Sequence, residues 1–214
     1  MTIQSLRPSK ATLAVLALAS TLAGAASTAL AATAPVDDSV RFSMVRAPAL
    51  ATAPYCVTGA RATVTIDPRG IAEDMMVRVE GLPPNTDFDF FVIQEPNGPF
   101  GLAWYQGDIE TNAKGVGFGH FIGRFNEETF IVAPGSVPAP SVHNNAFPDA
   151  TLNPKTGPIH TFHLGLWFNS PQDAVKAGCP GNVTPFNGEH NAGVQVLNTS
   201  NFPDLAGPLL KVRP

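Results

Sequence analysis

From Arg61 onward the sequence alternates between apolar and polar residues in short runs, which glycine, proline, asparagine and aspartate separate. The runs 61–66, 75–80 and 88–92 show this period of two. Because successive side chains of a strand point to opposite faces, the period predicts half-buried β-strands. Many short strands at this spacing are typical of an all-β domain. The pattern therefore predicts a single antiparallel β-sandwich, immunoglobulin-like or Greek-key.

Two segments interrupt the strand pattern. Around 171–177 the sequence predicts one short helix, with Ser170 as N-cap, Pro171 at the first helical position and Gly178 just past the end. The proline-rich segment 133–158 predicts a long loop. Loops of this length inside compact domains usually carry function.

The segment 101–125 predicts two strands joined by a tight turn at Asn112–Gly115. The second strand carries glycines at positions 115, 117, 119 and 123. A strand packs weakly on a glycine face, so another part of the chain must press close against it. A second hairpin turn is predicted at Asn187–Gly188.

The first 31 residues have the three parts of a secretory signal peptide. Arg7 and Lys10 form a basic start, an apolar run follows, and Ala29-Leu30-Ala31 is a cleavage site of the A-x-A type. Threonine, serine and glycine dilute the apolar run, which disfavours a transmembrane anchor. We therefore expect cleavage near Ala31 and a soluble product that is secreted, periplasmic or at the cell surface.

In the expected mature chain, the alanine- and proline-rich residues 32–59 predict a tether or one edge strand, and 60–214 the sandwich domain. Removing residues 1–31 takes away two of the 13 basic residues, so the mature formal charge is 11 minus 17, or −6. This acidity argues against a nucleic-acid partner, whose phosphates need clustered lysine and arginine. The sequence has no cluster of basic residues, so we do not expect the mature chain to attach to a membrane.

Cys56 and Cys179 are the only cysteines. An even pair in an exported protein predicts a disulfide, here between the start of the domain and a point near its end. Two cysteines are too few for a zinc ribbon, and no Cys-x-x-Cys motif is present for redox chemistry.

Residues 82–92, Leu-Pro-Pro-Asn-Thr-Asp-Phe-Asp-Phe-Phe-Val, resemble a strand-corner segment of fibronectin type III and related immunoglobulin-like domains. The resemblance implies a β-sandwich and brings no catalytic residue with it. The sequence departs from the family at Phe88, where the family has a tyrosine whose hydroxyl bonds to upstream backbone. The chain also resembles secreted bacterial β-sandwich proteins of no assigned activity.

The stretch from His160 to Phe168, His-Thr-Phe-His-Leu-Gly-Leu-Trp-Phe, is the segment that most resembles a metal-binding site, because it has two histidines three residues apart. On a helix, His160 and His163 would share a face and could chelate one ion. The alternation of the stretch predicts a strand, with Phe162 on its apolar face. The two histidines then point to opposite faces and cannot chelate one ion as a pair.

The same alternation places three histidines on the apolar faces of their predicted strands: His120, His160 and His190. Three neutral imidazoles with an open fourth position can form a zinc or copper site. The alternative is that each is a separate, partly buried histidine bonded to backbone. Both interpretations stay open, because the sequence does not give the strand order.

His163 and Trp167 share the other face of their strand, and Trp104 or Tyr105 could lie beside them. Exposed aromatic rings on one face can form a platform for a sugar ring, since they combine a large apolar surface with a polar edge. The four residues are therefore a candidate ligand-binding set. The alternative is that these rings belong to the core.

No catalytic signature is complete, so the catalytic residues are unknown. Gly-x-Ser-x-Gly is absent, and Lys-Thr-Gly at 155–157 lacks the motifs that would accompany it. The sequence favours an exported, non-enzymatic protein without a cofactor that binds an extracellular protein or carbohydrate through the loop 133–158. The alternatives are a metal-dependent extracytoplasmic enzyme with the three-histidine site, and a structural protein of the cell envelope.

Overall fold

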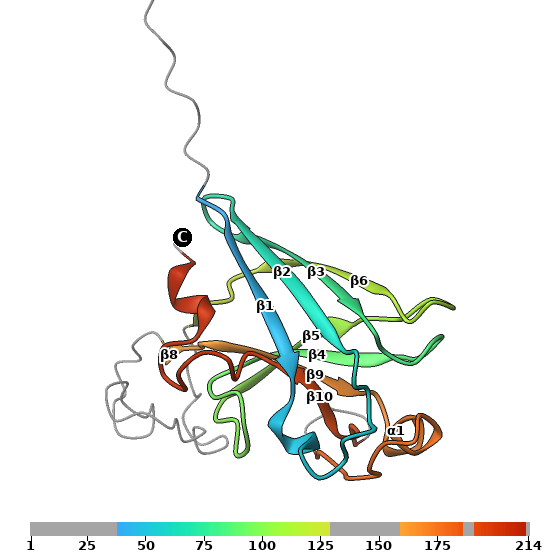
Figure 1. Cartoon of the computed structure of the whole chain (residues 1–214). Coiled ribbons are helices and arrows are strands. Elements are labelled where there is room, and N and C mark those ends of the chain that lie inside the picture. The colour runs from blue at the N-terminus through green and yellow to red at the C-terminus, as the bar shows by residue number, and fades with distance from the viewer. Residues whose placement is uncertain (1–37, 129–158, 186–190, 213–214) are drawn as a thin grey trace, which may run out of the picture. The chain divides into compact units, whose positions relative to one another are not determined.

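A computed structural model describes residues 38–128, 159–185 and 191–212 (Figure 1). Eight strands form one antiparallel sheet in the order β5-β4-β9-β10-β1-β2-β3-β6. They are β1 (Val40–Arg46), β2 (Arg61–Pro68), β3 (Glu73–Glu80), β4 (Phe88–Ile93), β5 (Ala103–Asp108), β6 (Gly117–Gly123), β9 (His163–Phe168) and β10 (Gln195–Asn198). The remaining elements are the strand pair β7 (Glu127–Glu128) and β8 (Ile159–His160), the helix α1 (Pro171–Lys176), and the 3-10 turns η1 (Pro48–Leu50) and η2 (Pro208–Lys211). The prediction of an all-β antiparallel domain with one short helix is confirmed.

Strand β1 joins the two halves of the large sheet. Its residues Val40–Met44 pair with β2, whereas Val45 and Arg46 pair with Asn198 and Leu197 of β10. The half β1-β2-β3-β6 faces the half that contains β4, β9 and β10 (Figure 1), so one continuous, barrel-like sheet encloses the core. Within the segment 32–59, predicted as a tether or edge strand, Val40–Arg46 therefore form an interior strand.

The main core fills the space between the two halves. On β2 and β3 the period of two is confirmed, because alternate side chains are buried: Ala62, Val64, Ile66, Met75, Val77 and Val79. Strand β4 and strand β9 are buried along their whole length. Their inward side chains belong to the main core, and the outward side chains of Phe91, Ile93 and Trp167 belong to a second cluster.

This second cluster is covered by the connection between β4 and β5. The side-chain amides of Gln195 and Asn198 donate to the carbonyl oxygen of Pro96 at 3.2 and 2.7 Å, which holds the connection against β10. The ring of Phe100 then packs edge-on against Trp167, with centroids 5.2 Å apart. Water is excluded from the outer face of β9 as a result.

Strand β6 turns its glycines toward the core. A Cβ at Gly119 would lie 2.6 Å from the ring of Phe121, and a Cβ at Gly117 would lie 2.9 Å from the side chain of Ile109. The predicted close approach to the glycine face is confirmed. The outward face carries His120 and its apolar neighbours, so the phase that placed His120 toward the core is wrong.

The predicted disulfide between Cys56 and Cys179 is present, and it joins Cα atoms 4.9 Å apart and 123 residues apart in sequence. Cys56 lies in a loop that the side chain of Arg46 holds. The guanidinium group donates to the carbonyl oxygens of Leu50, Ala53 and Cys56 at 2.9, 2.5 and 2.8 Å. A cation with three carbonyl partners fixes this loop beside the end of β1.

Helix α1 ends just before Cys179 and positions it beside Cys56. Ser170 is the N-cap, and its hydroxyl accepts from the amide of Asp173 at 3.1 Å. Gly178 has a positive φ of 75° just after the helix, a conformation that glycine adopts without strain. The predicted caps are confirmed at both ends.

The loop 133–158 and the turn at Asn187–Gly188 lie outside the described residues. Among the residues that the structure describes, no helix is long and apolar enough to cross a membrane.

Candidate functional site

The three histidines of the predicted metal site have separate surroundings where they are described. His120 is on the outward face of β6, and its Nε2 lies 2.5 Å from Oδ1 of Asp74. His160 is on β8, where its Nδ1 lies 3.5 Å from the side-chain oxygen of Asn126. His190 lies outside the described residues. In the described ranges no group of three or more His, Cys, Asp or Glu residues could hold a metal ion, and the three-histidine site stays a prediction.

The predicted aromatic platform is not on the surface at His163 and Trp167. Both side chains are 0% exposed. Trp167 packs against Phe91 and Phe100 at centroid distances of 5.4 and 5.2 Å. The platform is therefore wrong for this pair, because the β4–β5 connection covers a face that the sequence left open.

His163 is instead a buried histidine, and both of its ring nitrogens have hydrogen-bond partners. Its Nε2 donates to the carbonyl oxygen of Asp204 at 2.7 Å, and its Nδ1 accepts from the hydroxyl of Thr199 at 2.8 Å. Because a carbonyl can only accept, Nε2 carries a hydrogen, and in the neutral ring Nδ1 then accepts from the Thr199 hydroxyl. Burial lowers the pKa of His163 below its ordinary value of 6.5.

We expect acid to destabilise the domain through His163. Because its pKa is lower in the folded than in the unfolded chain, the unfolded chain binds more protons once the pH falls below about 6.5. The free energy of unfolding, measured by urea titration from about pH 7.5 to about pH 5.5, should therefore decrease as pH falls. In the variant His163→Gln this slope should be shallower. An identical slope in the variant would contradict the assignment.

Trp104 and Tyr105 are exposed, as the platform requires, but they point to opposite faces of β5. Trp104 pairs in register with Val92, which faces the main core, and Tyr105 pairs with Phe91, which faces outward. The Tyr105 hydroxyl donates to Oδ1 of Asp108 at 2.6 Å. Partial burial, and then the carboxylate of Asp108, raise the pKa of Tyr105. The two rings do not form one platform.

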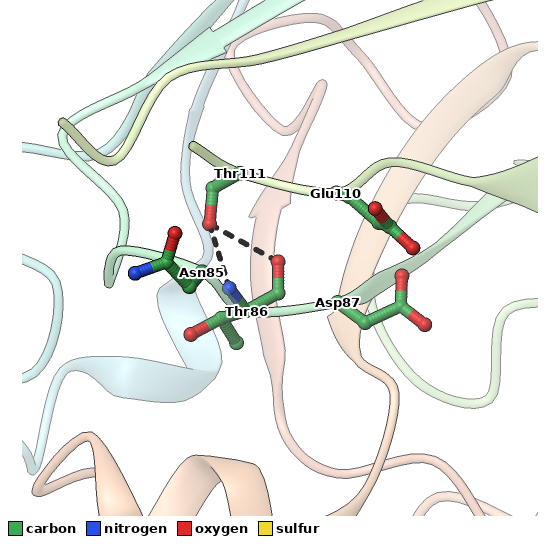
Figure 2. Close-up of a pocket in the computed structure, with 5 residues that line it drawn as sticks. All are labelled: Asn85, Thr86, Asp87, Glu110 and Thr111. Carbon is green, nitrogen blue, oxygen red and sulfur yellow. Dashed lines mark hydrogen bonds between the residues drawn. The ribbon is translucent and has the colours of Figure 1, made fainter. Parts of the chain in front are cut away.

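A pocket of about 300 Å³ opens where β4 begins and where the chain leaves β5 (Figure 2). We call it the acidic pocket; it is lined by Asn85, Thr86, Asp87, Glu110 and Thr111. The hydroxyl of Thr111 accepts from the amide of Thr86 and donates to its carbonyl oxygen, both at 3.0 Å. Figure 2 shows the carboxylates of Asp87 and Glu110 next to each other.

Crowded negative charge dominates the chemistry of the acidic pocket. Burial raises the pKa of Asp87, and the nearby carboxylates of Asp108 and Glu110 raise it further. The lining residues offer hydrogen-bond acceptors and include neither a histidine nor a cysteine. The lining therefore supplies two carboxylates, and the pKa of one of them, Asp87, is raised.

A second surface lies on the outward side of β3 and β6. We call it the β3–β6 face; its centre is formed by Met76, Phe118, His120 and Ile122. The exposed fractions of Phe118, Ile122 and Met76 are 64%, 71% and 46%. Isolated exposed apolar residues are normal, whereas several large ones on adjacent strands typically mark an interaction site.

Ion pairs flank the centre of the β3–β6 face. At one end Arg78, which pairs with Glu80, lies over the ring of Phe118 at 5.8 Å. At the other end Asp74, opposite Ile122 in register, pairs with Arg69 at 3.0 Å and with His120. The apolar centre of the face is thus flanked at both ends by charged side chains that have ion-pair partners within the chain.

The sequence contained a signal for this surface. Glycines at 117, 119 and 123 share one face of their strand, and a large side chain had to press against that face. If the glycine face is taken as the core face, Phe118 and Ile122 point outward. The acidic pocket has no such signal, because it depends on which loops meet.

A scan against protein-family models and a search of curated proteins both find no match to this chain.

Proposed function

We propose that this chain is an exported, non-enzymatic protein that binds a protein partner through the β3–β6 face. The observation that carries the proposal is the exposure of Phe118, Ile122 and Met76 on two adjacent strands. Leaving this apolar surface in water is unfavourable by about 25 cal/mol per Å², and a partner that covers it recovers that free energy. The N-terminal signal-peptide pattern and the disulfide support export.

The chemistry of the β3–β6 face favours a protein over a carbohydrate. The face is the outer surface of two hydrogen-bonded strands, and the outward carboxylates of these two strands are engaged, Asp74 with Arg69 and His120, and Glu80 with Arg78. Sugar hydroxyls need free acceptors around a ring that they can stack on. A protein surface with apolar side chains and charges of both signs fits the face as it stands.

Site-specific photo-crosslinking in the cells that export the protein tests the proposal. A benzophenone amino acid replaces Ile122, and in a matched control it replaces Tyr55, which is 73% exposed on a different part of the domain. We expect one defined protein adduct from position 122 and none from position 55.

The adduct from position 122 should disappear when Met76→Asp is added, because a charge is placed in the centre of the apolar surface. Unfolding curves with urea check that this variant is folded. Equal adducts at positions 55 and 122, or no protein adduct at position 122, would overturn the proposal.

A further inference from the structure

We infer that the partner of the β3–β6 face is a second copy of this chain, bound about a twofold axis. The inference rests on the proposed function and names its partner. It is carried by the arrangement of charge along the face, whose two ends have opposite signs.

The end near Phe118 is positive. Arg61 and Arg78 both pair with Glu80 there, which leaves two positive charges against one negative charge. Arg78 stands directly opposite Phe118 in the register of β3 and β6. Its guanidinium lies over the ring and is 47% exposed at the side chain, so it is available to a partner.

The end near Ile122 is negative. Asp67 of β2 and Asp74 of β3 stand directly opposite each other, and Arg69 and His120 both pair with Asp74, whose side chain is 16% exposed. Among the described residues no ion pair involves Asp67. Like charges directly opposite each other destabilise a sheet, so a cation supplied from outside would stabilise this end.

A twofold axis brings these two ends together. The axis lies between the two faces, perpendicular to β6, and passes next to the row that holds Met76 and His120. Rotation by 180° reverses the direction of β6, so Phe118 of one copy packs against Ile122 of the second copy. The same rotation places Arg78 of each copy over Asp74 of the other. Such an isologous contact uses one surface patch on both copies and closes after two.

The small size of the face limits the area that the contact can bury. With the outer side of β2 included, which carries Arg61 and Asp67, three strands span about 14 Å and the seven residues of β6 span about 23 Å, so the flat area is about 300 Å² per copy. Stable interfaces bury about 800 Å² per partner. We therefore expect a weak, concentration-dependent dimer with a dissociation constant above about 10 μM.

Charge reversal tests this geometry. Sedimentation equilibrium of the disulfide-bonded exported protein, from roughly 10 μM to 1 mM, gives the dissociation constant. Arg78→Asp and Asp74→Arg should each weaken the dimer at least about tenfold, since each places like charges at both symmetric contacts. Lys176→Asp on helix α1 is the control and should leave the dimer unchanged.

Mixing the two single variants is the decisive step. Across the twofold axis, Asp at position 78 of one variant meets Arg at position 74 of the other, and Asp74 meets Arg78. The mixture should therefore dimerise to within about threefold of the unmodified protein, although neither variant does so alone. A folding defect cannot produce this recovery, because both chains keep their substitutions.

The outcomes separate this inference from the proposed function. A protein that stays monomeric to the highest concentration, or a mixture that stays monomeric, overturns the twofold dimer. If the adduct from position 122 then contains a different protein, the proposed function stands and only the identity of the partner is wrong. If there is no adduct either, both fail.

Discussion

Replacing Cys56 and Cys179 with serine is expected to lower the free energy of unfolding by about 5 kcal/mol. The bridge closes a loop of 123 residues in the unfolded chain, and in the chain-entropy model a loop of this length contributes about this amount. A domain of this size has about 5–15 kcal/mol of stability in total, so the double variant should lose a third or more of it. Urea titration followed by tryptophan fluorescence measures the difference.

The reduced natural protein is the control for this experiment. Its unfolding curve should coincide with that of the double serine variant, because both lack the same crosslink and keep nearly the same side-chain volumes. If the double variant retained the stability of the oxidised protein, the contribution of the bridge would have been overestimated. If the variant were much less stable than the reduced protein, the hydroxyl groups rather than the lost bridge would be the cause.

The second large effect is expected for Trp167→Ala, which should lower the free energy of unfolding by about 3–5 kcal/mol. The indole is completely buried between Phe91 and Phe100, so removing it leaves a cavity under the β4–β5 connection. The same urea titration, followed by far-ultraviolet circular dichroism, gives the loss in the free energy of unfolding.

Trp104→Ala provides the matched comparison for this prediction. Its side chain is 51% exposed on an edge strand, so truncation should change stability by no more than about 0.5 kcal/mol. An exposed binding platform would require Trp167→Ala to be equally harmless. Similar small effects for the two tryptophans would therefore contradict the burial of Trp167.

Much of the fold could be predicted from local patterns. Where one strand face is apolar and the other is polar, as at Val64 and Val77, the period of two identified the buried side chains correctly. The helix caps at Ser170 and Gly178 and the cysteine pair were also predictable. Each of these features depends on neighbouring residues or on the count of one residue type.

The failures occurred where both faces of a strand carry apolar side chains. On β9 the phase was correct, but Trp167 and His163 are covered by segments that are distant in sequence. On β6 the alternation assigns the larger apolar set, with Phe118 and Ile122, to the core face, although Phe121 packs against the core above the glycines. Periodicity cannot decide between two apolar faces; only the tertiary contacts do. The same strand then carries the surface that we propose as the binding site.

The pairing of β1 with β10 has a consequence for the order in which the domain can form. Residues 45 and 46 find their partners only at 197 and 198, so the first and last strands of the sheet must meet. A chain that emerges from a ribosome or a translocation channel with its N-terminus first cannot close this sheet until nearly all of it has emerged. Until then β1 has an unpaired edge, which is the usual condition for pairing with a wrong strand. A truncated chain that lacks β10 should therefore keep this edge of β1 unpaired and aggregate.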